Sequence, residues 1–90
     1  MSIKKIKLYP TVKVRTAHPE CILAFDPSRD LFYEFNSSGS ELFLYIYKNN
    51  SSKQIIDKLV KSYEMTEKEA EKNLGNFLDK LIKLGIAFEA

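Results

Sequence analysis

The sequence predicts one α+β domain in which an N-terminal three-stranded antiparallel sheet is followed by three helices. Three observations predict this class. Apolar residues alternate with polar ones in the first third of the chain, as they do in half-buried strands. The rest of the chain carries apolar residues at helical spacing, preceded by residues that commonly begin helices. With 90 residues, the chain can form one hydrophobic core but not two, so residues 1–90 are predicted to be a single domain.

The strands are predicted over about residues 5–15, 20–26 and 31–36. Asp26-Pro27 begins a turn, because proline fixes φ for a tight reversal, and the runs on either side of it are therefore predicted to form a hairpin. Aromatic residues dominate the third run, which is typical of a strand. In the first run, four apolar residues alternate with charged ones on either side of an interruption at Pro10: Ile6, Leu8, Val12 and Val14.

The helices are predicted over about residues 38–48, 52–64 and 67–84. The pattern of residues 42–47 fits a strand as well as a helix, and the preceding cap signal favours the helix. Gly85 follows the third helix at the position where a glycine commonly ends one. Residues 36–41 offer overlapping N-caps for the first helix. A pair with the spacing of a capping box occurs at the start of each helix: Ser38 with Glu41, Ser51 with Gln54 and Thr66 with Glu69.

Composition excludes several classes of protein. The longest apolar run, residues 42–47, is far shorter than the roughly 20 residues that a membrane helix needs. Residues 1–7 contain lysines without the apolar stretch of a signal peptide. Cys21 is the only cysteine, so no intramolecular disulfide can form. We therefore expect a cytoplasmic protein that does not enter a membrane.

Residues that could carry catalysis are few and scattered. His18 is the only histidine and lies between the first two predicted strands, where it cannot form a metal site alone. Cys21 alternates with Leu23 and Phe25, which predicts a small buried hydrophobe. The acidic residues that begin the third helix complement its dipole and need no acid–base role: Glu67, Glu69 and Glu71. We expect neither enzymatic activity nor a cofactor.

A winged-helix DNA-binding regulator is the alternative function, since three helices and a small sheet can build one. The third helix would read the DNA, yet its lysines are balanced by acids, and the acids at its start would be repelled by phosphates. A wing hairpin normally follows that helix, and few residues follow Gly85. We therefore expect no nucleic-acid partner.

The N-terminal segment is basic. Five of the 14 basic residues and none of the 12 acidic ones lie in residues 1–15, although the net charge is only +2. A solvated outer face is the favoured interpretation, and docking of a partner enzyme is the other. The five residues are Lys4, Lys5, Lys7, Lys13 and Arg15.

Two features indicate that the protein captures a peptide. If residues 31–35 are the last strand of a meander, their outer edge lacks a partner and can accept another strand, because it carries neither proline nor lysine to protect it. The second feature is a flank of the third helix with residues four, three and four apart: Glu71, Gly75, Leu78 and Ile82. A glycine there costs about 1 kcal/mol. It fits a groove that admits a foreign backbone and close helix–sheet packing equally well.

The order of these motifs resembles the PqqD-like family of peptide chaperones from about residue 12 to the end. The chain departs from the family at Phe35, Phe43 and Asn73, where leucine, tryptophan and aspartate are usual. The two aromatic changes preserve packing. The change at Asn73 leaves open which members of the family, and which modifying enzymes, this chain matches. The matching motifs are Phe32-Tyr33-Glu34-Phe35-Asn36-x-x-Gly39, a helix bearing Phe43, Ser51-x-x-Gln54-Ile55, and Phe77-Leu78-x-x-Leu81-x-x-x-Gly85.

This resemblance implies a RiPP recognition element, a winged-helix-like domain that binds the leader of a ribosomally made precursor peptide as an added strand. The domain presents the leader to a modifying enzyme, most commonly a radical S-adenosylmethionine enzyme, with other maturases or a leader peptidase as alternatives. The chain would be a monomer or a weak homodimer.

In this sequence the leader would lie along residues 31–35 and the third helix. Lys68 and Lys72 would steer an acidic leader. Main-chain groups of Leu31, Tyr33 and Phe35, or of the alternating set with Glu34, would pair with it. Its apolar side chains would enter a pocket formed by Phe32, Glu71, Gly75, Leu78 and Ile82.

Overall fold

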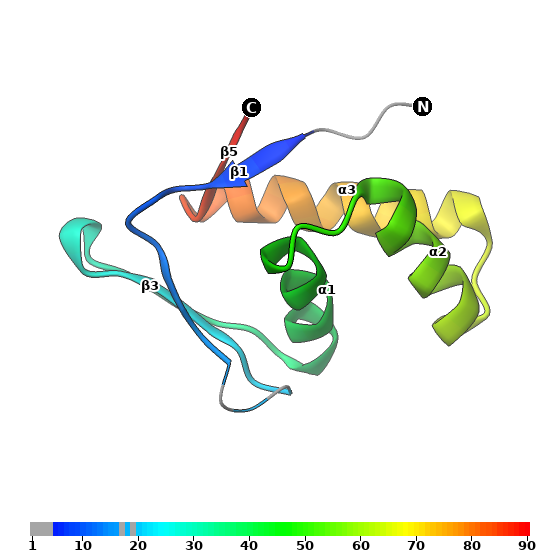
Figure 1. Cartoon of the computed structure of the whole chain (residues 1–90), viewed down its shortest axis with the longest axis horizontal. Helices are drawn as coiled ribbons and strands as arrows, with labels where there is room; N and C mark the ends of the chain where they lie inside the picture. The colour runs from blue at the N-terminus through cyan, green and yellow to red at the C-terminus, as the bar shows by residue number, and fades with distance from the viewer. Residues whose placement is uncertain (1–4, 17, 19) are drawn as a thin grey trace.

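The structure is a computed structural model that describes residues 5–16, 18 and 20–90 (Figure 1). Strands β2, β3 and β4 form a three-stranded antiparallel sheet in that order, and three helices follow. The predicted fold class is therefore confirmed. The elements are β1 (Ile6–Leu8), β2 (Lys13–Arg15), β3 (Leu23–Asp26), the short 3-10 helix η1 (Pro27–Arg29), β4 (Leu31–Glu34), α1 (Ser37–Tyr47), α2 (Ser52–Tyr63), α3 (Glu67–Lys83) and β5 (Ala87–Glu89).

The first predicted strand, residues 5–15, is two strands in different sheets, so the prediction of one strand was wrong. Proline lacks an amide hydrogen and favours turns, and around Pro10 the amide of Val12 donates to the carbonyl of Tyr9 at 3.0 Å. Beyond this turn, β2 joins β3, whereas β1 pairs antiparallel with β5. Of the basic N-terminal residues, Lys4 lies outside the described residues.

Gly85 ends α3 as predicted and turns the chain back toward β1. Its φ of +80° is left-handed, a conformation that only glycine adopts without strain. The amides of Gly85 and Ile86 donate to the carbonyls of Ile82 and Leu81 at 3.0 and 3.1 Å. The residues after this turn form β5, a strand that the sequence did not predict.

Two of the three predicted capping boxes are confirmed. Ser51 and Thr66 begin α2 and α3, and both hydrogen bonds of a capping box are present in each. In α1 the N-cap is Asn36, whose side chain accepts a hydrogen bond from the Gly39 amide at 2.8 Å. The capping box predicted from Ser38 and Glu41 is therefore absent, because the N-cap lies two residues before Ser38, at one of the overlapping N-caps that residues 36–41 offered.

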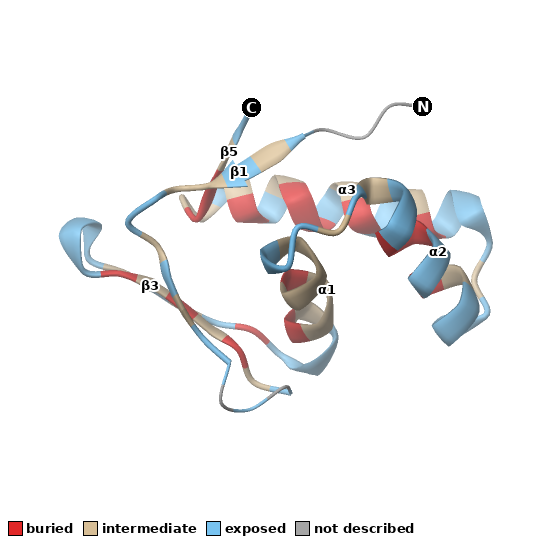
Figure 2. Cartoon of the chain, viewed as in Figure 1, coloured by how far each residue is buried: buried red, intermediate tan, exposed pale blue. Residues whose placement is uncertain are grey.

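Helix α3 joins two hydrophobic clusters, and Figure 2 shows buried positions recurring along one side of it. One cluster lies between α2 and the part of α3 from Ala70 to Leu78: Ile55, Ile56, Leu59, Ala70, Leu74 and Leu78. The other lies between the sheet, α1, the C-terminal half of α3 and β5: Ile22, Ala24, Phe35, Phe43, Phe77, Leu81, Ile86 and Ala87.

The face of β3 that meets the core is not the predicted one. Ile22 and Ala24 are buried, whereas Cys21 is half-buried on the opposite face together with Leu23 and Phe25. The prediction of a buried Cys21 was therefore wrong. Both faces of this strand carry apolar residues, so alternation alone cannot identify the core face.

Asp26 is a fully buried carboxylate that ties the hairpin turn to the loop after β1. It accepts hydrogen bonds from the Ser28 amide and hydroxyl, the Thr11 hydroxyl and the Arg29 guanidinium. The bonds from Ser28 and Thr11, with that from Arg29, hold the pKa of Asp26 well below its usual range. Arg29 also donates to the Gly85 carbonyl at 2.7 Å, which connects the hairpin to the end of α3.

We expect acid to destabilise the fold partly through Asp26. Because its folded-state pKa lies below the unfolded value of about 3.9, the stabilisation is complete above that pH and is lost as the pH falls through the folded-state pKa. Asp26→Asn should lower the urea midpoint at neutral pH and flatten its decline in acid, measured by circular dichroism at several pH values. An unchanged midpoint at neutral pH would show that this network does not stabilise the fold.

Candidate functional site

Strand β4 lies at the edge of the three-stranded sheet, and among the described residues it pairs only with β3. In an antiparallel ladder, residues whose amide and carbonyl both face the neighbour alternate with residues whose groups face away. The Phe35 amide donates to the Ile22 carbonyl at 2.9 Å, so by register Tyr33 also faces β3. The main-chain groups of Phe32 and Glu34 therefore point outward and have no strand partner in the described part of the chain.

The sequence left open which of two alternating sets of main-chain groups on this strand would pair with a leader, and the strand geometry selects one of them. The main-chain groups of Leu31, Tyr33 and Phe35 already face β3, and those of the alternating set are available. Side chains follow the same alternation: Leu31, Tyr33 and Phe35 turn toward the core, whereas Phe32, 67% exposed, and Glu34 lie on the outer face. Phe32 is therefore on the face of the sheet away from the core, and its part in peptide binding stays a prediction.

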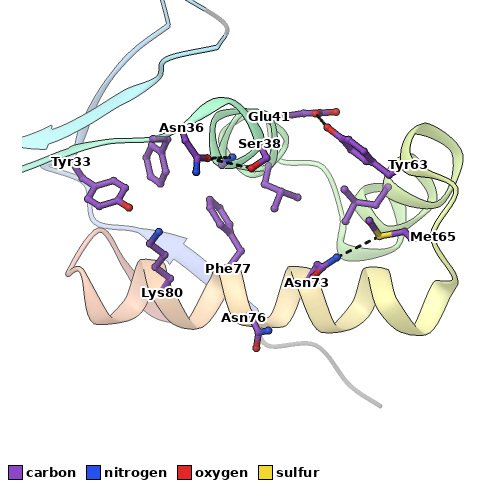
Figure 3. Close-up of a pocket in the computed structure, with 14 residues that line it drawn as sticks. Tyr33, Asn36, Ser38, Glu41, Tyr63, Met65, Asn73, Asn76, Phe77 and Lys80 are labelled. Carbon is purple, nitrogen blue, oxygen red and sulfur yellow. Dashed lines mark hydrogen bonds between the residues drawn. The ribbon is translucent and has the colours of Figure 1, made fainter.

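A groove of about 480 Å³ lies between β4, the start of α1, the end of α2 and one flank of α3 (Figure 3). An apolar floor with a polar rim is the usual composition of a ligand site. The apolar lining comes from Phe35, Leu42, Leu59, Met65 and Phe77. The polar lining comes from Tyr33, Asn36, Ser38, Gly39, Glu41, Tyr63, Asn73, Asn76 and Lys80.

Aromatic contacts fix the floor of the groove. The ring centroid of Phe35 lies 4.6 Å from that of Phe43 and 5.8 Å from that of Phe77. The buried Ser40 hydroxyl accepts a hydrogen bond from the Ile22 amide at 2.9 Å and donates to the Phe35 carbonyl at 3.3 Å. These contacts hold the end of β4 against α1 and α3, so the groove exists before any ligand binds.

Opposite charges mark the two ends of the groove. Lys80 reaches from α3 toward Tyr33, and its Nζ lies 5.2 Å from the centre of that ring. At the other end, Glu41 accepts hydrogen bonds from the hydroxyls of Tyr45, at 2.8 Å, and Tyr63. Burial and Glu41 raise the pKa of Tyr45 to about 12, and the bond to Glu41 raises the pKa of Tyr63. Both hydroxyls therefore remain donors at neutral pH.

The flank of α3 predicted to bind does not line the groove. The buried residues Ala70, Leu74 and Leu81 form the core stripe of α3. Helical spacing places Asn73, Asn76 and Lys80 on one side of this stripe, and the residues predicted to bind the leader on the other side. Both flanks border the same core stripe, so the sequence pattern alone could not choose between them. The predicted residues on the far flank are Glu71, Gly75, Leu78 and Ile82.

Two residues of the far flank have clear surroundings that do not include the groove. Leu78 is buried in the cluster with α2, and a Cβ at Gly75 would meet nothing within 4 Å, so that glycine serves neither close packing nor the groove. Lys68 and Lys72 are exposed and are not part of the lining. Sequence reasoning missed Lys80 and the residues from α1 and α2, and it noted Asn73 only as a departure from the family pattern.

Gly75→Ala should stabilise the protein without affecting the groove. The added methyl group fills open space in a helix interior, where alanine is favoured over glycine by about 0.5–1 kcal/mol. Urea denaturation should show this gain. Gly85→Ala is the matched control and should destabilise, because its φ is positive and a Cβ would approach Leu31 to 3.3 Å. A destabilised Gly75→Ala variant would show that the flank is more closely packed than the structure indicates.

The groove can hold an extended chain by hydrogen bonds and apolar contact. Within residues 5–16, 18 and 20–90, no cluster of three acidic, histidine or cysteine side chains could hold a metal ion. None of the described helices is long and apolar enough to cross a membrane. His18 is exposed, outside the groove lining.

Comparison with known proteins shows a family and a solved structure to which this chain is similar. The family profile described as coenzyme PQQ synthesis protein D (PqqD) matches residues 21–87. The solved structure of TbiB1 in complex with the TbiA(beta) leader peptide has a similar fold, with a TM-score of 0.81 and 15% sequence identity. The match covers 90% of this chain and 93% of that one. No curated protein sequence matches the chain.

Proposed function

The chain belongs to the family of coenzyme PQQ synthesis protein D, since the family match covers well over half of it, and from this premise we propose its function. It binds the leader region of a ribosomally made precursor peptide and presents that peptide to a modifying enzyme. TbiB1, which shares the fold, is bound to a leader peptide in its solved structure, and this supports the proposal.

One observation carries the proposal: an unpaired strand edge and a preformed apolar groove lie side by side along β4. A leader segment would add to the sheet as a strand next to β4 and exchange hydrogen bonds with Phe32 and Glu34. Each such bond contributes about 0.5–1.5 kcal/mol. Because β4 is only four residues long, most of the affinity must come from apolar leader side chains that enter the groove, at about 1.5–3 kcal/mol each.

The groove gives each part of the leader a different environment. An apolar anchor would contact Phe35 and Phe77 on the floor, and amides of the leader backbone could bond to the side chains of Asn73 and Asn76 on α3. Lys80 would favour a leader carboxylate near Tyr33. The contacting residues proposed here thus replace the far flank of α3 that the sequence suggested.

We further propose that the chemistry belongs to a partner enzyme. No described histidine or cysteine lines the groove, and its two charged residues, Glu41 and Lys80, lie at opposite ends. A radical S-adenosylmethionine enzyme is the partner that the family suggests, and the cytoplasm is the setting because the peptide is made there by ribosomes.

The test is a titration of the ¹⁵N-labelled protein with synthetic peptides that span the N-terminal region of each short open reading frame found beside its gene. Saturable amide shifts should appear in β4, around Asn36 and over residues 73–80, and residues 52–56 of α2 should be unaffected. Duplex DNA is the control and should produce no saturable shifts. Tight binding of duplex DNA, together with no response to any leader peptide, would contradict the proposal. That result would favour the alternative function, a winged-helix DNA-binding regulator.

A further inference from the structure

An added strand presents side chains on both faces of the sheet, and only one of these faces the groove. We infer that, if the leader adds to β4 as proposed above, Phe32 and Glu34 read its sequence from the outer face. The leader residue opposite Phe32 is apolar, and the residue opposite Glu34, two positions away, is lysine or arginine. This pattern defines the class of peptide that the protein accepts.

The strand register aligns the side chains of the outer face in two rows. Lys13, Phe25 and Phe32 form one row across β2, β3 and β4, and Arg15, Leu23 and Glu34 form the next. Directly opposite residues in a sheet have Cβ atoms about 4.5–5.5 Å apart on the same face. An added strand therefore extends each row by one leader residue, whichever way the strand runs.

The first row ends in an apolar side chain that this chain leaves uncovered. Phe32 is 67% exposed, whereas Phe25, its neighbour in the row, is half-buried. The main-chain groups of Phe32 point at the free edge, so a strand bonded to them places a side chain directly against its ring. Aromatic and β-branched residues pair well across strands, which favours an apolar residue at that position.

The second row ends in a carboxylate. Arg15 cannot neutralise Glu34, because Leu23 lies between them and the Arg15 guanidinium lies over the Phe25 ring, 5.9 Å from its centre. In the part of the chain that the structure describes, Glu34 forms no ion pair. A basic leader residue opposite Glu34 would be favoured, and an acidic one would be repelled.

The leader residue between these two points to the other face. It meets the groove side of the sheet, where Tyr33 and Lys80 lie. Of three consecutive leader residues, the first and third thus contact Phe32 and Glu34 on the outer face, and the middle one contacts the groove side. The pattern is apolar–x–basic or its reverse, according to the direction of the strand.

The experiment selects peptides from a displayed library of random 12-residue sequences and keeps those that protect the Phe32 and Glu34 amides from hydrogen exchange. Wild-type protein should enrich an apolar and a basic residue two positions apart. Glu34→Lys should enrich an acidic residue in place of the basic one, and lysine is well tolerated on an exposed edge. Glu89→Lys is the matched control, with the same charge change at an exposed residue of β5, and should select as wild type does.

Affinities then quantify the preference. Replacing the basic residue of a selected peptide by glutamate should weaken binding to wild type roughly threefold to tenfold, and Glu34→Lys should restore it. The inference would be overturned if the selected peptides protected both amides but showed no charge preference, with wild type and with Glu34→Lys alike. Strand addition would remain intact in that case. If no peptide protects the two amides, strand addition itself fails, and the inference fails with it.

Discussion

Asn73→Trp is expected to weaken leader binding by about tenfold or more while the protein remains folded. Asn73 is exposed on the groove flank of α3, so an indole there occupies the space that an apolar leader side chain would fill. Losing one buried anchor costs about 1.5–3 kcal/mol, and 1.4 kcal/mol is a factor of ten in affinity. Fluorescence anisotropy with a labelled leader peptide measures the change, and circular dichroism checks the fold.

Gly75→Trp is the matched control for that variant. It places the same side chain two residues away on the opposite flank, where a Cβ meets no neighbour within 4 Å. Its leader affinity should equal that of the wild type. Equal losses in both variants would mean that the groove flank of α3 has no special role, and a loss confined to Gly75→Trp would return the site to the flank that the sequence first suggested.

Phe32→Pro is expected to weaken leader binding by about tenfold relative to Phe32→Ala. Both variants remove the aromatic ring, but only proline also removes the outward amide hydrogen and places its ring where the incoming backbone must lie. The amide of residue 32 makes no bond to β3, so an edge strand can accept the change. Titration calorimetry measures both affinities.

Tyr33→Pro should have a different effect. The Tyr33 amide faces β3, so its loss removes a bond of the sheet, and thermal unfolding should detect the damage. If Phe32→Pro unfolded the protein as Tyr33→Pro does, or bound the leader as well as Phe32→Ala does, the assignment of outward groups on β4 would be wrong.

Local signals predicted most of the fold. Ser51, Thr66 and Gly85 mark helix ends through hydrogen bonds to residues a few positions away, and such signals are visible in the sequence. Pairing of β1 with β5 was not visible, because it joins opposite ends of the chain and each strand has only three residues. The sequence showed a break at Pro10 but could not show that the chain leaves one sheet there and joins another.

The candidate site was predicted in part. The free edge followed from the order of the strands and the composition of residues 31–35. The choice between the two sets of main-chain groups depends on register, which the bond from Phe35 to Ile22 determines. The groove flank of α3 could not be chosen because it depends on where β4 and α2 lie, and Gly75 drew attention to the wrong side. Glu41 and Met65 reach the groove from separate elements, which no local pattern indicates.

Amide hydrogen exchange in β4, followed by NMR, tests the central claim most directly. In the free protein the amides of Phe32 and Glu34 should exchange fast, while those of Tyr33 and Phe35 are protected by β3. Saturating leader peptide should slow exchange at the first pair and leave the second pair unchanged. Protection of Phe32 and Glu34 before any peptide is added, or fast exchange that persists at saturation, would contradict strand addition at β4.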